Sequence, residues 1–174
     1  GETAENVADR WKISREEQDR FAHNSQLKYQ KAHEADRFKS QLIPVSIPQR
    51  KADPLLFAKD EHPRLSSPEK LAALKPAFKA GGSVTAGNSS GINDGSAASL
   101  MANEAVIKKM NTKPLARVVS MAVAGVTPDC MGIGPVPATK KALKRAGLTV
   151  KDLDLVELNE AFASQSLACM RDLD

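Results

Sequence analysis

The feature that most constrains the fold is an alternation of apolar and helix-forming segments that begins near residue 95. Three apolar runs predict buried strands, and three other segments predict helices. The strands are expected at 96–101, 115–123 and 153–158, and the helices at 103–110, 137–146 and about 160–171. Because strands that alternate with helices are typical of a mostly parallel sheet with covered faces, this part of the chain is expected to be α/β.

The first 91 residues have a different character, polar and mainly helical. Ser14 and Glu17 form the pattern of a capping box, which predicts a helix over about 15–34. Two short extended segments and a second short helix are expected to follow. They lie at 42–48, where prolines favour a sheet edge, at 54–61 and at 68–74.

Length and charge exclude several classes of protein. At 174 residues the chain is long enough for one domain or two small ones with a sizeable core. The 25 basic and 21 acidic side chains are interleaved, so no basic block points to nucleic acid, and a mild attraction to small anions is expected. No run of about 18 apolar residues is available to cross a membrane.

The two cysteines, Cys130 and Cys169, have no metal-site spacing and are too few for a disulfide framework. They favour a reducing compartment, and no metal is expected. The chain has neither an initial Met nor a secretion signal, so we expect an internal segment of a longer protein. A cytoplasmic, bacterial location is the default expectation, because a targeting signal would lie on a terminus that is absent.

Three places could carry chemistry. Asn159 follows an apolar run, at the carboxyl end of an expected strand, where open α/β sheets bind ligands. Its amide could polarise an oxygen or hold a water without titrating, although a simple helix N-cap is the alternative. The Thr85–Gly91 loop lacks a phosphate-binding motif but could lie against an extended amide-containing ligand; a mobile connector is the alternative.

The third place is Met131, which lies beside two glycines in a loop that leads into a helix and could line an apolar pocket, with core packing as the alternative. The following helix carries four basic side chains that indicate a solvated face more than a phosphate site. These are Lys140, Lys141, Lys144 and Arg145.

Six stretches, in order along the chain, together resemble the thiolase family. They are TAENVA at 3–8, SREEQD at 14–19, LKPAF at 74–78, VTAGNSSGINDG at 84–95, MGIGPVP at 131–137 and NEAFA at 159–163. The resemblance covers essentially the whole chain, and six motifs in register are specific.

The resemblance implies an α/β fold of two mirrored βαβαβαββ halves in five αβαβα layers, with an α-rich loop domain inserted in the first half. Residues 1–91 would be the loop domain that binds coenzyme A, 92–113 the last strand and helix of the first half, and 114–174 the beginning of the second half. The implied activity is acyl transfer, by thiolytic cleavage of 3-ketoacyl-CoA or Claisen condensation of acyl-CoA.

The resemblance also implies roles for individual residues. Asn159 would position a water in an oxyanion hole for the thioester oxygen. The residues expected to contact acyl-CoA are Arg64 at the adenine end, Phe78, Ala86, Ser90, Ala161 and Phe162 along the pantetheine arm, and Met131 in the acyl pocket. Coenzyme A is then a substrate, and no further cofactor is expected.

The family's nucleophilic cysteine and its G-H-P-x-G histidine have no counterpart in the sequence. We therefore expect this chain to be a fragment that is inactive alone, with Cys130 and Cys169 as packed bystanders. The complete enzyme would be a homodimer or homotetramer, and complementary fragments of the same protein are possible partners. The alternative is a non-catalytic module that binds acyl-CoA or another protein. Residues 60–64 and 66–78 resemble the broad 3-ketoacyl type slightly more than the acetoacetyl type, and the sequence does not specify the length of the acyl chain.

Overall fold

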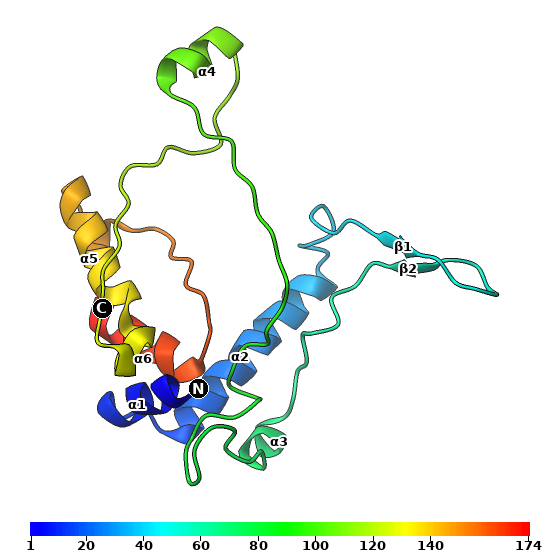
Figure 1. Ribbon diagram of the computed structural model, residues 1–174, viewed down its shortest axis with the longest axis vertical. Coiled ribbons are helices and arrows are strands. Elements are labelled where there is room, and N and C mark those ends of the chain that lie inside the picture. The colour runs from blue at the N-terminus through cyan, green and yellow to red at the C-terminus, as the bar shows by residue number, and fades with distance from the viewer.

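The computed structural model describes residues 1–174, and helices dominate its regular structure. In chain order the elements are α1 (Glu2–Arg10), α2 (Arg15–Glu34), β1 (Val45–Ile47), β2 (Leu55–Phe57), α3 (Pro68–Ala72), α4 (Glu104–Met110), the 3-10 helix η1 (Pro128–Ile133), α5 (Pro135–Ala146), the 3-10 helix η2 (Val150–Asp152) and α6 (Ala163–Leu173). Figure 1 shows α1, α2 and α6 gathered together, with the β1–β2 hairpin and α4 projecting from them in different directions.

Helix α2 begins as the capping box predicts. The Ser14 hydroxyl accepts from the Glu17 backbone N–H at 3.2 Å, and the Glu17 carboxylate accepts from the Ser14 backbone N–H at 2.8 Å. The helix runs to Glu34, and Asp36 follows in the left-handed region with φ of 54°. A short polar side chain tolerates this conformation better than most, which suits Asp36 to the end of a helix.

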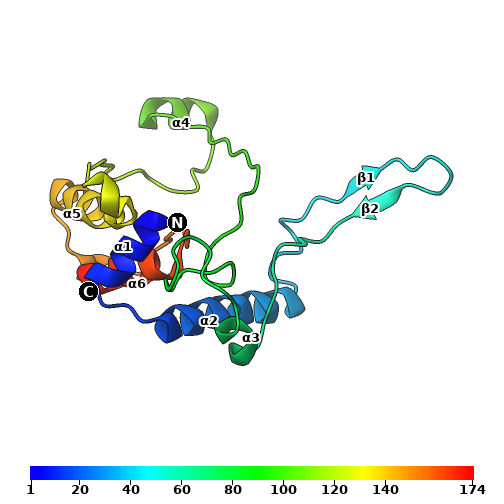
Figure 2. The ribbon, with the colours of Figure 1, turned by 60° about the horizontal axis from the view of Figure 1, so that its bottom comes forward.

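The core lies where α1, η1 and α6 cross. Its fully buried members come from all three elements and from the turn after α1, and they are Val7, Ile13, Cys130 and Ala168. Trp11 packs against this cluster and donates a 3.0 Å hydrogen bond from its indole N–H to Asp172. Residues distant in sequence therefore meet in one small apolar centre, where α1 and α6 lie together at the left of Figure 2.

The two short strands form an antiparallel hairpin in which Val45 pairs with Phe57 and Ile47 pairs with Leu55. Because side chains alternate along a strand, these four apolar residues share one face of the hairpin. That face is exposed, and the hairpin extends away from the helices in Figure 2. The extended segments predicted at 42–48 and 54–61 are thus confirmed in part, since each contains a three-residue strand.

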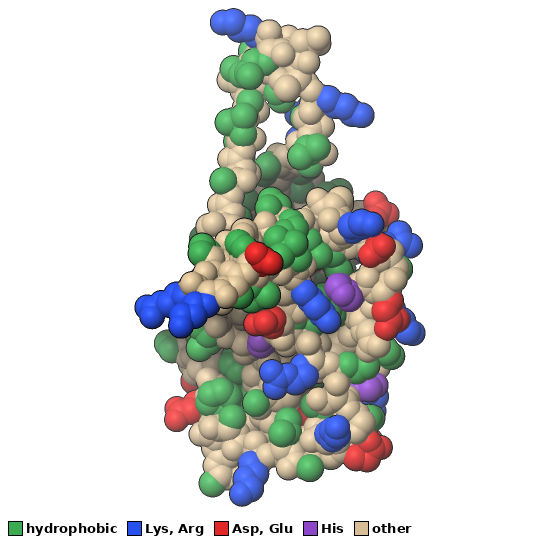
Figure 3. All heavy atoms as spheres, turned by 90° about the vertical axis from the view of Figure 1, so that its right-hand side faces the viewer, with side chains coloured by type: hydrophobic (Ala, Val, Ile, Leu, Met, Phe, Trp, Pro, Cys, Tyr) green, Lys and Arg blue, Asp and Glu red, His purple; other side chains and the backbone are tan.

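The expected parallel sheet does not form within these 174 residues. Residues 96–101, 115–123 and 153–158 run without strand pairing, and Leu115, Val119 and Val123 are exposed. A buried strand needs neighbours for its backbone N–H and C=O groups, and the chain supplies none here. Figure 3 shows hydrophobic side chains along the segments that lead to α4.

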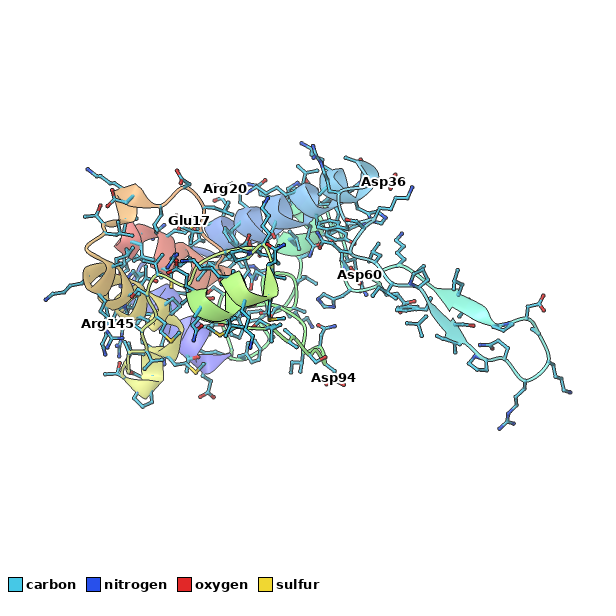
Figure 4. All side chains as sticks on the ribbon, turned by 90° about the horizontal axis from the view of Figure 1, so that it is seen from above. Glu17, Arg20, Asp36, Asp60, Asp94 and Arg145 are labelled. Atoms are coloured by element: carbon cyan, nitrogen blue, oxygen red, sulfur yellow. The ribbon has the colours of Figure 1, made fainter.

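Basic side chains of α5 supply part of the missing pairing. Lys141 Nζ donates to the Val123 carbonyl at 3.1 Å, and Arg145 donates to the Met121 carbonyl at 2.7 Å. Both side chains lie on an exposed helix face, as expected, but they also bind backbone oxygens of the 115–123 segment. Figure 4 shows Arg145 at the opposite end of the molecule from the hairpin.

The accessible surface reflects these unpaired segments. It measures 13641 Å², and only 19 residues are buried. A folded monomer of this mass exposes about 8,300 Å² by the usual size scaling. The excess belongs mainly to the hairpin, to α4 and its flanking segments, and to 153–158. No helix has the length and apolar character needed to span a bilayer.

The capping box gives a pH-dependent contribution to stability. The hydrogen bond from the Ser14 backbone N–H, helped by the Ser14 hydroxyl and the Arg171 guanidinium, lowers the pKa of Glu17. A carboxyl with a depressed pKa in the folded state stabilises the fold above its unfolded pKa and loses this contribution as pH falls through the folded value. We predict that Glu17→Gln lowers the melting temperature at pH 7 and makes it less sensitive to acid between pH 5 and pH 3, measured by circular dichroism.

The matched control is Glu16→Gln, which removes an exposed carboxylate from the same helical turn. This variant should keep the acid sensitivity of the unsubstituted chain. Equal acid sensitivity in the Glu17→Gln variant and the unsubstituted chain would show that the capping carboxylate does not contribute.

Candidate functional site

Two segments that the sequence singled out lie side by side. The Ser90 N–H donates to the Ala161 carbonyl at 2.9 Å, and the Ala163 N–H donates to the Asn88 carbonyl at 2.9 Å. Between these two bonds, Ser89 and Phe162 form an antiparallel bridge. The Gly- and Ser-rich loop is therefore attached by its backbone to the segment that follows the last expected strand.

Helix α1 holds the beginning of this loop, which we call the Ser83–Ser90 loop. The buried carboxylate of Glu5 accepts hydrogen bonds from the Ser83 N–H at 2.9 Å, from the Val84 N–H at 2.9 Å and from the Ser83 hydroxyl at 3.1 Å. Several donors compensate a carboxylate for the water it loses on burial. A side chain at Gly82 would collide with this carboxylate, so glycine is required for the close approach.

Helix α2 holds the middle of the loop through Asp19. The Asn88 amide donates to Asp19 Oδ1 at 2.9 Å, and its own Oδ1 accepts from the Thr85 N–H at 2.8 Å. Val84, Thr85 and Asn88 are buried. A mobile connector would have neither this burial nor these bonds, so that alternative is wrong.

Two aromatic rings flank the junction. Phe78 and Phe162 meet edge to face with 6.1 Å between ring centroids. A side chain at Gly1 would overlap the Phe78 ring, so this ring lies against the first turn of the chain. Phe78 is 45% exposed, Ala161 and Phe162 are half-buried, and Ala86 and Ser90 are exposed. The expected contact residues thus leave an accessible, mostly small and apolar surface.

Asn159 lies just before this junction with its side chain exposed. Its carbonyl accepts from the Ala161 N–H at 3.0 Å, which turns the chain sharply. The neighbouring Glu160 accepts a 2.7 Å hydrogen bond from the Ser25 hydroxyl of α2. Helix α6 begins at Ala163 with Phe162 as its N-cap, so the interpretation of Asn159 as an N-cap is wrong.

The structure does not bring Arg64 and Met131 to the junction between the Ser83–Ser90 loop and residues 161–163. The Arg64 N–H donates to Gln26 of α2 at 2.9 Å, and its side chain is exposed. Met131 lies in η1 and is 66% exposed, so it is not packed in the core of these 174 residues. A side chain at Gly91 would meet the His62 imidazole, which places His62 at the end of the loop. Figure 4 shows Asp60, two residues earlier, at the base of the hairpin.

Sequence reasoning missed Glu5, Asp19, Asn88 and His62 as residues that shape the site. Glu5 and Asp19 belong to the TAEN and SREEQD motifs, so the signal was present, but nothing local indicated that their partners lie 69 to 79 residues away. Asn88 was quoted within the loop motif without a role of its own.

The two cysteines are buried, as expected for packed thiols. Burial raises the pKa of the Cys169 thiol, whose sulfur lies 3.5 Å from the Gly132 carbonyl. Because the thiolate is the nucleophile, a buried thiol with a raised pKa is poorly reactive at neutral pH.

We predict that iodoacetamide modifies both cysteines at pH 7.5 far more slowly in the folded chain than in guanidinium, as followed by peptide mass spectrometry. The denatured chain supplies the control, because unfolding removes burial from both thiols. Rapid modification of Cys169 in the folded chain would contradict the inert role.

The comparisons with known proteins agree along the whole chain. The family models described as "Thiolase, N-terminal domain" and "Thiolase, C-terminal domain" match residues 1–105 and 112–174. The acetyl-CoA acetyltransferase of Syntrophomonas wolfei is 54% identical over 173 residues, and the beta-ketoadipyl-CoA thiolase of Acinetobacter baylyi is 50% identical over 173 residues. Each alignment covers 99% of this chain and 43% of the relative, so the chain spans less than half the length of these proteins.

Solved structures show the same similarity in three dimensions. The acetyl-CoA acetyltransferase of Bacillus anthracis superposes with a TM-score of 0.92 at 49% identity, covering 99% of this chain and 44% of that one. Human mitochondrial 3-ketoacyl-CoA thiolase in complex with CoA superposes with a TM-score of 0.84 at 44% identity, covering 99% and 42%. The unpaired segments thus follow their course in larger α/β structures, the expected fold class is confirmed, and the chain belongs to the thiolase family.

Proposed function

We propose that the complete protein is a thiolase-type acyltransferase, which cleaves 3-ketoacyl-CoA with CoA or joins acyl-CoA units by Claisen condensation. The observation that carries the proposal is the backbone pairing of Ser89 with Phe162, which joins the Ser83–Ser90 loop to the segment that bears Asn159. The names of the relatives, acetyl-CoA acetyltransferase and beta-ketoadipyl-CoA thiolase, support the same chemistry.

Asn159 is the residue of this chain that we assign to the reaction. Removal of a proton beside a thioester carbonyl moves negative charge onto the carbonyl oxygen. The exposed Asn159 amide can hold a water that donates to this oxygen, and it keeps its donor at any working pH. A donor of this kind is typically worth about 3 kcal/mol of the barrier. The thiolate nucleophile and the base would come from outside these residues.

The accessible surface around the junction is the proposed path of the pantetheine arm. Ala86, Ser90, Ala161 and Phe162 are small or apolar, and Phe78 closes one side. Such a surface admits a narrow chain with amide groups while the exposed loop offers polar contacts. We further assign Met131 to the acyl pocket and Arg64 to the adenine end. The bound CoA in the human 3-ketoacyl-CoA thiolase supports coenzyme A as the substrate.

We also propose a domain organisation, an oligomeric state and a location for the complete enzyme. Residues 1–91 form the coenzyme-binding loop domain, 92–113 end the first half, and 114–174 begin the second half. The complete enzyme is a homodimer or homotetramer in a cytoplasmic setting. Strands from the rest of the protein would pair with the exposed 115–123 and 153–158 segments, which explains their apolar character.

A chimera tests the role of Asn159. Residues 1–174 replace the matching stretch of the Bacillus anthracis acetyltransferase, whose fold this chain follows at a TM-score of 0.92. We predict that Asn159→Ala in this chimera lowers kcat for acetoacetyl-CoA thiolysis by about a hundredfold, with little change in KM, because about 3 kcal/mol of barrier stabilisation is lost. The loss of the absorbance of the acetoacetyl-CoA enolate gives the rate.

Asn24→Ala is the matched control, since it removes an exposed asparagine amide from α2. This control should retain the parental kcat. A folded chimera without CoA-dependent thiolysis would contradict the proposed function, and full activity in the Asn159→Ala variant would contradict the assigned role.

The isolated 174-residue chain is predicted to give no measurable thiolysis, because neither of its cysteines is an exposed thiolate. A coupled thiolysis assay with the chain at micromolar concentration measures this directly. Calorimetric titration with CoA in the same sample tests the binding-module alternative, which requires the isolated chain to bind CoA, and absence of binding would contradict that alternative. A substantial rate would contradict the expectation that further residues are needed.

A further inference from the structure

We propose that Asp19 is a positioning residue that, through Asn88, sets the conformation of the Ser83–Ser90 loop for the pantetheine arm. The inference rests on the proposed function, in which this loop contacts coenzyme A. It assigns a role to a carboxylate on α2 that has no direct contact with the proposed substrate path.

Both carboxylate oxygens of Asp19 are engaged. Oδ1 accepts from the Asn88 amide at 2.9 Å, and Oδ2 accepts from Arg15 Nε at 2.8 Å. A second nitrogen of Arg15 donates to the carbonyls of Leu71 at 2.7 Å and Leu74 at 2.9 Å. Asp19 is 7% exposed, so its rotamer is fixed by these bonds and by packing.

Asn88 transmits this fixed position to three parts of the chain. Its amide nitrogen also donates to the Ser83 carbonyl at 3.1 Å, and its amide oxygen accepts from the Thr85 N–H at 2.8 Å. Its backbone carbonyl accepts from the Ala163 N–H at the start of α6. Through its side chain and its backbone, this one buried residue therefore links α2, the beginning of the loop at Ser83 and Thr85, and the start of α6.

The hydrogen bond between Asn88 and Asp19 has a fixed direction, which substitutions can reverse. Asp19 can only accept, and Asn88 presents its NH₂ group to it. Asn88→Asp would place two carboxylates 2.9 Å apart at a buried site, which strongly disfavours the present geometry. Combining Asp19→Asn with Asn88→Asp restores one donor and one acceptor between the two side chains and retains the bond from Thr85. It replaces the ion pair with Arg15 by a hydrogen bond to a neutral amide and loses the bond to the Ser83 carbonyl.

The active chimera described above is the assay. We expect Asp19→Asn to raise KM for CoA by about tenfold with kcat within about twofold, because an asparagine has a single acceptor oxygen and cannot accept from both Arg15 and Asn88. Asn88→Asp should raise KM further, and the double variant should recover most of that loss. Melting temperatures are recorded for every variant.

Ile13→Val is the stability control, since it trims the core cluster without touching the loop. It should lower the melting temperature and leave KM unchanged. If Asp19→Asn lowers the melting temperature and also leaves KM unchanged, Asp19 is only structural and the proposal is overturned.

The double variant covers the case in which Asn88→Asp does not fold. Recovery of folding and of KM in the double variant supports the pairing, whereas no recovery contradicts it. A folded parental chimera without thiolysis overturns the proposed function and this inference together. An active parent with unaffected KM in Asp19→Asn overturns this inference alone.

Discussion

Two buried carboxylates hold the Ser83–Ser90 loop against the helices that precede it in sequence. Glu5 on α1 binds the backbone of Ser83 and Val84, and Asp19 on α2 binds the side chain of Asn88. A buried charge is costly unless donors surround it, so each carboxylate selects the loop conformation that presents N–H groups to it. The pairing of the loop with residues 161–163 depends on that conformation.

The buried residues are distributed unevenly along the chain. The helices α1, α2 and α6, the 3-10 helix η1 and the loop hold most of the buried residues, whereas 91–127 and 153–158 run mostly exposed. The segments that bear Ser90 and Phe162 are therefore positioned by helices and by one another, without a sheet. The sheet expected of the family would need strands from outside these residues. In the proposed function the nucleophile also comes from outside them. In the proposed function the chain therefore supplies the coenzyme surface and the oxyanion donor, and other residues supply the rest of the active site.

Short sequence patterns predicted the elements whose ends are stabilised by residues next to them in the chain. The Ser14–Glu17 box located α2, and Gly147, with φ of 71°, ended α5 where expected. Helix α1 was not predicted, because its N-cap is Gly1 and no side chain caps it. The strands at 115–123 and 153–158 could be recognised as apolar but not as unpaired, since pairing depends on other segments. For Asn159, the capping role was excluded only by the observed start of α6, which begins at Ala163 with Phe162 as its N-cap.

Amide hydrogen exchange of the 174-residue chain, resolved by residue, tests the central claim most directly. The claim is that the carboxylates and the helices order the loop and its junction with 161–163 while the expected strands remain unpaired. The amides of Val84, Thr85, Ser90 and Ala163 should exchange slowly, because each is hydrogen-bonded, and those of 115–119 should exchange near the rate of an unstructured peptide. Loop amides that exchange as fast as those of 115–119 would contradict the account.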